Sequence, residues 1–278
     1  MKQTFRLSRC SCLLALFSIA QFLPTQAHEA EALGTIPTET CLAERGKLIL
    51  NDDGSLERGR KVAAKFPESV KLRATAGHWE RSEEINVWRS TWNPKMGHIP
   101  VVSYQGITTS NLIIEVSFRF GATSEPWHHQ CFRIAVDDRP KITGHILSAW
   151  ANPNNKFIEQ GFLLQHIRKQ KDKTVIEDLL LDHQPLDTQA NRWHTAILEV
   201  VGDEALFRMG SHVAYAKAKQ IEMPKNLVSL TMGTTWHEIK RVRIWEANTN
   251  PSWPSRKKKI LESRRAFKPK IHNYTCLK

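Results

Sequence analysis

The segment EVVGDEALFRMGSHVAYA, residues 199–216, predicts three antiparallel strands in succession. Two short apolar runs flank Gly202-Asp203, and a third run follows Gly210-Ser211. Glycine at the first of two central turn positions favours a primed hairpin turn, because glycine adopts a positive φ there without steric cost. The segment therefore indicates a meander of strands joined by two tight turns.

Strand patterns continue on both sides of this meander. In LIIEVSFRF (112–120), Ile114, Val116, Phe118 and Phe120 share one face, whereas Glu115, Ser117 and Arg119 share the other. Further short apolar runs are QCFRIAV (130–136), GHILSAW (144–150), FIEQGFLLQHI (157–167), WHTAILEVV (193–201), LVSLTMG (227–233) and EIKRVRIW (238–245). Turn-forming residues separate them, and this spacing is typical of an all-β sandwich or barrel.

The chain divides into four predicted parts. Residues 1–27 read as a signal peptide, 28–76 as an N-terminal arm with the first strands, 77–250 as the β-sandwich, and 251–278 as a basic C-terminal extension. In the extension, WPSRKKKILESRRAFK (253–268) favours a short helix with Ser255 as N-cap. Ile260, Leu261 and Phe267 form its apolar stripe.

The first part has the features of a secretory leader. Lys2, Arg6 and Arg9 precede an apolar run from 13 to 23, and small residues lead to Ala27, the expected cleavage point. No later segment reaches the length of a membrane-spanning helix. We therefore expect the mature protein to be secreted, periplasmic or at the cell surface.

Basic charge is concentrated at the C-terminus. The formal net charge is +12, and residues 251–278 contain nine basic residues against Glu262 alone. A basic field over the whole protein, as nucleic-acid binding requires, is therefore not expected. Two alternatives stay open for the extension: electrostatic attachment to an anionic polysaccharide, cell-wall polymer or membrane surface, or an arm that packs its apolar stripe on the sandwich.

Three cysteines follow the leader: Cys41, Cys131 and Cys276. An oxidising compartment allows one disulfide, and because domain termini often lie close together, we predict the pair Cys41–Cys276, with Cys131 buried in a strand. No two cysteines have the Cys-x-x-Cys spacing of a structural zinc site. We expect neither a metal nor another cofactor.

Two longer stretches carry a resemblance to a known superfamily. They are NRWHTAILEVVGDEALFRMGSHVAYA (191–216) and LVSLTMGTTWHEIKRVRIWEA (227–247), in which Trp193 opens a strand and Val242-Arg243-Ile244-Trp245 closes the last one. Together with the upstream NLIIEVSFRF, they resemble the concanavalin A-like lectins and glucanases, especially laminin G-like and keto-disaccharide hydrolase-like secreted domains. The resemblance spans about residues 77–247 and implies a jelly roll of two antiparallel sheets, a fold that hosts lectins, glycosidases and adhesion modules.

Candidate catalytic carboxylates are few. Retaining glucanases of this fold place a Glu-x-Asp-x-x-Glu array on one strand, because double displacement needs two carboxylates on the same side. The chain has no such array; the nearest candidates are Glu80, Glu84 and Glu159. A charged strand end or a salt bridge explains these three residues more simply, so a laminarinase-type mechanism is not expected.

Candidate sugar-binding residues are more widespread. Sugars are held by aromatic faces and by polar side chains that bond the hydroxyl groups. The candidates are Trp127, His128, His145, Trp150, Gln165 and Arg168, which lie on predicted strands, strand ends or loops. His128-His129 does not predict a metal site, because adjacent strand residues point to opposite faces. Asp137-Asp138 is interpreted as a turn former.

These features predict a secreted, lectin-like β-sandwich that binds an oligosaccharide or polysaccharide, with the basic extension as a second contact for an anionic ligand. The first alternative is a glycoside hydrolase of the keto-disaccharide type, and the second is a structural or adhesion module with a protein partner. A hydrolase needs a partly buried carboxylate that faces a groove. A lectin should show exposed aromatic side chains without that carboxylate, and an adhesion module should show neither.

Overall fold

The computed structural model describes residues 38–52, 69–81, 87–123, 125, 128–139, 144–156, 158–170 and 175–275. The predicted signal peptide, Glu84, Trp127 and Cys276 lie outside these residues. Within the described residues, no helix is both long and apolar enough to cross a membrane.

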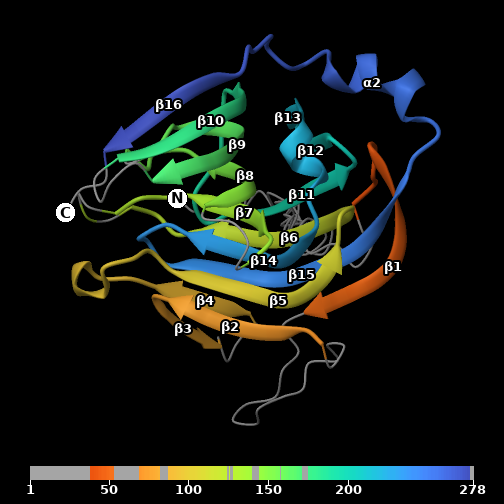
Figure 1. Cartoon of the computed structure of the whole chain (residues 1–278). Helices are drawn as coiled ribbons and strands as arrows, with labels where there is room; N and C mark the ends of the chain where they lie inside the picture. The colour runs from red at the N-terminus through yellow and green to blue at the C-terminus, as the bar shows by residue number, and fades with distance from the viewer. Residues whose placement is uncertain are drawn as a thin grey trace, which may run out of the picture.

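Two antiparallel sheets face each other and form a sandwich (Figure 1). Sheet A has the order β13-β12-β11-β6-β15-β4-β3, and β1 also pairs with β15. Its strands are β1 (Ala43–Asp52), β3 (His78–Arg81), β4 (Trp88–Thr91), β6 (Leu112–Phe120), β11 (Trp193–Val201), β12 (Glu204–Met209), β13 (His212–Lys217) and β15 (His237–Thr249).

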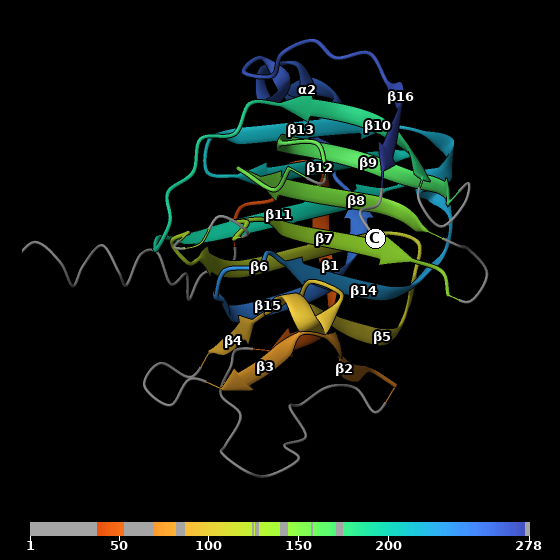
Figure 2. The same cartoon turned by 90° about the vertical axis from the view of Figure 1, so that its left-hand side faces the viewer.

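Sheet B has the order β16-β10-β9-β8-β7-β14-β5-β2 and is seen from its outer side in Figure 2. Its strands are β2 (Lys71–Ala76), β5 (Val101–Thr109), β7 (Phe132–Asp137), β8 (His145–Asn152), β9 (Gly161–Gln170), β10 (Val175–Gln184), β14 (Lys225–Met232) and β16 (Lys270–Thr275). The remaining elements are the 3-10 helices η1 (Pro94–Met96) and η2 (Lys219–Glu222) and the helix α2 (Trp253–Leu261). The predicted jelly-roll sandwich with a short C-terminal helix is confirmed.

The predicted meander is also confirmed. β11 pairs with β12 and β12 with β13, and each hairpin has a two-residue loop. Gly202 and Gly210 occupy the first loop positions, both with φ of +56°. Because an L side chain rarely adopts this φ, glycine at these two positions sets the register of both hairpins.

Alternating side chains fill the core between the sheets. On β6, Ile114, Val116, Phe118 and Phe120 point inward, as their spacing predicts. Phe118 stacks on Phe132 of the opposite sheet with ring centroids 3.8 Å apart. A second stack across the sheets joins Phe162 and Phe207 at 4.2 Å. These contacts hold the sheets face to face, so the outer face of sheet B is free to carry polar groups.

The sandwich extends beyond the predicted limits of residues 77 and 250. β1 and β2 precede residue 77, and both complete the sheets by pairing with β15 and β5. After residue 250, α2 begins at Trp253, with Ser252 rather than Ser255 as its N-cap. β16 then pairs along β10. First strands were expected within residues 28–76, whereas no strand was predicted in the basic extension, because the partner of β16 lies far away in the sequence.

The C-terminal extension packs on the sandwich through its predicted apolar stripe. Ile260 and Leu261 join a cluster with Leu206 and Trp253 at the β12–β13 edge of sheet A. Phe267 packs over the outer face of sheet B, in a cluster that contains Trp150. The extension therefore crosses from sheet A to sheet B. Its apolar side chains pack on the sandwich, as the second of the two alternatives predicted for the extension states.

Candidate functional site

Strand alternation brings polar side chains together on the outer face of sheet B. In register across four neighbouring strands lie Ser103, Ser229, Ala135 and Ser148. Gln165 of β9 continues the row, because it pairs with Ser148. Since alternate residues of a strand share one face, all of these side chains point away from the core.

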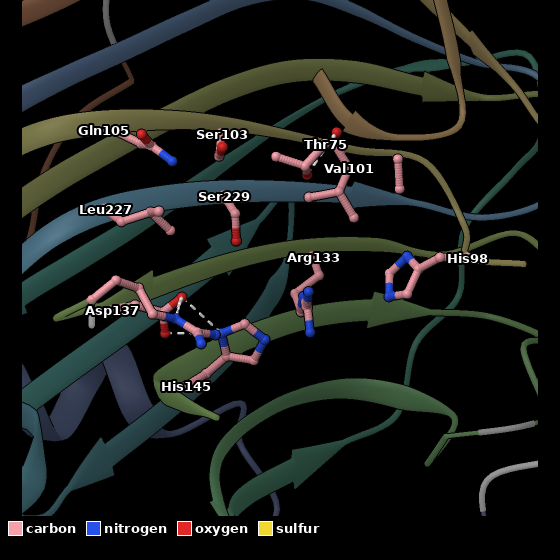
Figure 3. A pocket seen from close by; sticks show the side chains of 12 residues that line it. Thr75, His98, Val101, Ser103, Gln105, Arg133, Asp137, His145, Leu227 and Ser229 are labelled. Atoms are coloured by element: carbon pink, nitrogen blue, oxygen red, sulfur yellow. Dashed lines mark hydrogen bonds and ion pairs between the residues drawn. The ribbon is translucent and has the colours of Figure 1, made fainter. Parts of the chain in front are cut away.

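An open groove of about 500 Å³ runs over this face. It is lined by Thr75, Ala76, His98, Val101, Ser103, Gln105, Arg133, Asp137, Arg139, His145, Leu227 and Ser229. Figure 3 shows the labelled side chains of β5, β14, β7 and β8 projecting into it. The volume lies in the range of small-molecule sites, and the lining mixes hydroxyl, amide and ionic groups with a few apolar surfaces.

A histidine and an aspartate form a fixed pair in the groove. His145 Nδ1 lies 2.8 Å and 2.9 Å from the two carboxylate oxygens of Asp137. Burial lowers the pKa of His145, and the charge of Arg133 lowers this pKa further, against the opposing effect of Asp137. A neutral His145 therefore donates its Nδ1–H to Asp137. Its Nε2 then serves as a hydrogen-bond acceptor.

Arg133 lies at the floor of the groove and is 8% exposed. Its Nε and Nη2 donate to Thr231 Oγ1 at 3.1 Å and 2.7 Å. Its guanidinium carbon lies 4.9 Å from the ring centroid of Trp150. Burial lowers the pKa of Arg133 to about 10, so the side chain is still charged at neutral pH. The site thus contains a buried positive charge.

Three buried polar atoms near Arg133 lack a hydrogen-bond partner: Ser148 Oγ, Trp150 Nε1 and Asp178 Oδ1. Burial raises the pKa of Asp178 to about 7, although Arg133 acts in the opposite direction. Unsatisfied buried polar groups are costly and are therefore rare in native proteins. The described residues contain further atoms of this kind away from sheet B, so the three mark polar surroundings of Arg133 and do not by themselves define a site.

The Asp178 carboxyl makes stability depend on pH. Its pKa is near 7 in the folded protein against a model value of 3.8, so the folded state binds the proton more tightly. Its contribution to stability is therefore lost as pH rises from about 4 to 7. We expect Asp178→Asn to raise the free energy of unfolding by about 2 kcal/mol at pH 8 and to change it little at pH 4.

Urea unfolding at pH 4 and pH 8 measures this difference between wild type and variant. Asp187→Asn is the matched control, because Asp187 is exposed in the loop that follows β10. An Asp178→Asn protein that loses stability at pH 8 would show that the native carboxylate is charged and well paired, contrary to this prediction.

Of the predicted sugar-binding residues, the structure places His145 in the groove. Trp150 and Gln165 lie on the same face of sheet B, but they are 4% and 1% exposed. Trp150 is covered by Phe267, Ile99 and Ile158, so its predicted role as an open stacking surface is corrected.

The other predicted binding residues do not line the groove in the described part of the chain. His128 is half-buried in the loop before β7, where its Nδ1 accepts the backbone N–H of Glu125 at 3.2 Å. Arg168 lies on β9, and its side chain is outside the described residues. Trp127 is outside them altogether. The predicted roles of Arg168 and Trp127 stay predictions.

The two candidate catalytic carboxylates within the described residues, Glu80 and Glu159, are not among the residues that line the groove. Glu80 is half-exposed on the edge strand β3, and its carboxylate lies 3.6 Å from His78. Glu159 lies 3.1 Å from His272 Nδ1 and 3.8 Å from His183 Nδ1. Glu84 is outside the described residues. Glu159 therefore has the salt-bridged surroundings that the sequence favoured over a catalytic role.

The predicted Cys41–Cys276 disulfide stays a prediction, because Cys276 lies outside the described residues, among which Cys41 is a free cysteine. Cys41 is buried beside Leu206 and Trp253 at the edge of sheet A. Cys276 is outside the described residues, but Thr275, the residue before it, pairs with Val175 in sheet B. Cys131 is free and buried, but it lies one residue before β7 rather than within a strand, and burial raises its pKa to about 11.

The sequence did not single out Arg133, Asp137, Ser103 or Ser229. Asp137 was interpreted as a turn former, but it is the last residue of β7 and bonds His145. The alternation in FRIAVD could have placed Arg133 and Asp137 on one face. Within the described residues, no group of three metal-ligating side chains is present.

Comparisons with known proteins add only likenesses of fold. No protein-family model matches the chain, and no curated protein does. A Bacillus subtilis protein of unknown function with a galectin-like fold is 6% identical, with 75% of this chain and 100% of that chain covered and a TM-score of 0.44. The carbohydrate-binding module CBM66 from Bacillus subtilis is 7% identical, and the match covers 63% of this chain and 95% of that module with a TM-score of 0.43. A tetrameric galectin from the ball sponge Cinachyrella is 8% identical, with 52% and 99% covered and a TM-score of 0.40.

The class of fold follows from the order of the strands. Two antiparallel sheets packed face to face form a jelly-roll β-sandwich, the fold that the sequence resemblance implied. Assignment to the laminin G-like or keto-disaccharide hydrolase-like group stays a prediction.

Proposed function

We propose that this protein is a secreted carbohydrate-binding protein whose ligand occupies the groove on the outer face of sheet B. One observation carries the proposal: an open groove of about 500 Å³ in which hydroxyl, amide, imidazole and guanidinium groups converge from five strands. Such a surface offers many hydrogen bonds and little apolar area, which suits a ligand rich in hydroxyl groups.

Each side of the groove supplies different contacts. Ser103, Gln105 and Ser229 can donate to or accept from sugar hydroxyls. His145, held by Asp137, adds a hydrogen-bond acceptor in a fixed orientation. Leu227 supplies apolar surface for the C–H face of a sugar ring. Because Trp150 is covered, this mode of binding relies on hydrogen bonds more than on aromatic stacking.

The basic extension is a second contact in this proposal. Lys258 and Lys259 on α2 and Arg265 after it are exposed. They lie beyond the apolar side chains that dock the extension, so their charges face solvent. Exposed charges of this kind attract an anionic polymer over about 10 Å, and salt weakens the attraction.

Binding to a glycan panel tests the proposal. We expect the mature protein to retain at least one oligosaccharide, and Gln105→Ala combined with Ser229→Ala to weaken retention by at least about tenfold, since each lost hydrogen bond is worth about 1 kcal/mol. Thr195→Ala is the matched control, because Thr195 is a polar residue on the outer face of sheet A, where it bonds Ser117.

Three results would contradict the proposal. Equal loss in the Thr195→Ala control would mean that the groove is not the site. Release of free sugar from the retained glycan would replace the binding function with the hydrolase alternative. Failure to retain any glycan, combined with capture of a defined protein partner, would favour the adhesion alternative.

A further inference from the structure

Arg133 is the one groove residue whose charge the surrounding side chains leave uncompensated. None of the ion pairs among the described residues includes Arg133, and its hydrogen bonds go to the neutral hydroxyl of Thr231. A buried charge without a partner of opposite sign destabilises a fold, because water no longer solvates it. Such a group is retained more readily where a ligand supplies the missing charge.

Asp137 and Asp178 both act electrostatically on Arg133, but together they do not offset the positive charge at the floor of the groove. Asp137 accepts a hydrogen bond from the neutral His145, and its single negative charge is shared between Arg133 and Arg139, whose Nε lies 3.8 Å away. Arg139 adds a second positive charge at the half-exposed rim. Asp178 is buried, and burial raises its pKa to about 7, so its carboxyl is only partly ionised at neutral pH. Two guanidinium groups therefore face one full and one partial negative charge, and the floor around Arg133 keeps a net positive charge.

The neighbours of Arg133 are hydrogen-bond donors without acceptors. Trp150 is paired with Arg133 in the β7–β8 register, and Ser148 lies two residues along the same face. Neither Trp150 Nε1–H nor Ser148 Oγ–H has a hydrogen-bond acceptor among the described residues. The side chain of Arg133 donates from Nε and Nη2 to Thr231, and its Nη1 donates to no described residue. The Trp150 and Ser148 donors are buried and neither residue lines the groove, so Arg133 itself is the group of this cluster that a ligand contacts. A ligand group with acceptor oxygens and a negative charge would match the guanidinium better than a neutral hydroxyl does.

We propose that the groove recognises an acidic glycan, and that Arg133 binds the carboxylate or sulfate group of one sugar residue. The inference rests on the proposed carbohydrate-binding function and names its ligand class. A planar guanidinium binds carboxylate and sulfate oxygens more directionally than an ammonium group does. The subsite is distinct from the exposed cations of α2, since Arg133 lies on β7 beneath the groove.

The test compares acidic oligosaccharides with the same oligosaccharides after carboxyl reduction or after desulfation. Isothermal titration of the mature protein should show at least about tenfold tighter binding of the acidic member of a pair, equivalent to about 1.4 kcal/mol. Arg133→Gln should abolish this preference and leave affinity for the neutral member within about threefold. Arg133→Lys, which keeps the charge but loses the planar fork, should retain part of the preference and guards against a folding defect in Arg133→Gln.

Lys47→Gln is the matched control, because Lys47 is exposed on β1 of sheet A and the substitution removes one positive charge away from both the groove and the basic extension. This control variant should prefer acidic glycans as strongly as the wild type does. In the wild type, 0.5 M salt should weaken the preference only partly, because buried charges are screened little. Carboxylated and sulfated pairs identify which anion the subsite takes.

Two outcomes overturn the inference and leave the proposed function intact: equal binding of acidic and neutral members, or a preference for the acidic member that survives in Arg133→Gln. Absence of binding to every glycan by the wild type overturns the proposed function and this inference together.

Discussion

Gly106→Ala is expected to prevent stable folding, with a loss of more than about 4 kcal/mol in the free energy of unfolding. Gly106 lies within β5 at a φ of +87°, where L side chains are strained. A Cβ built there would lie 1.9 Å from the backbone oxygen of Ser69. The clash is with main chain, so no rotamer change relieves it, and the buried Val70 next to Ser69 must move with it.

The yield of soluble protein and urea unfolding measure this effect. Gly97→Ala is the matched control: Gly97 has a similar φ of +71°, but a Cβ there would have no atom within 4 Å. It should cost only about 1 kcal/mol, from backbone strain alone. A Gly106→Ala protein as stable as Gly97→Ala would show that the Ser69 segment adjusts freely and does not support β5 beside the groove.

Asp182→Ala is expected to lower the free energy of unfolding by about 3–5 kcal/mol, because it leaves a largely buried arginine without its counterion. Asp182 is fully buried and accepts hydrogen bonds from Arg264, Gln184 and the backbone N–H of Tyr215. It therefore joins β10 of sheet B, β13 of sheet A and the C-terminal extension at one carboxylate.

The same substitution should release the extension that crosses sheet B. Hydrogen exchange of the backbone amides from 262 to 275 should increase in Asp182→Ala, whereas the amides of β6 should stay protected relative to the variant's own stability. Glu262→Gln, which alters an exposed carboxylate of the same segment, should change neither quantity. Unchanged exchange in Asp182→Ala would mean that Phe267 and β16 hold the extension without Arg264.

The sequence predicted one residue of the groove, His145, as a binding residue, but it did not reveal the buried positive charge of Arg133. The pattern around His145 marked it as a strand residue on a polar face, and the structure places it in the groove beside Asp137. Asp137 was assigned to a turn because its neighbour is also an aspartate. Arg133 carried no local signal, because its importance depends on which carboxylates lie near it.

The sequence by itself determined the local structure of this protein. Glycines at turn positions selected the two hairpins, since Gly202 and Gly210 adopt a φ that other residues avoid. The period-two alternation of β6 determined which of its side chains form the core. Tertiary structure alone decided the neighbours of β7: β14, from a distant part of the chain, pairs with it and brings Thr231 and Ser229 to Arg133. The physical reason is that alternation determines the face on which a side chain lies, whereas the charge balance and exposure of that face depend on strand pairing and on the extension that packs over it.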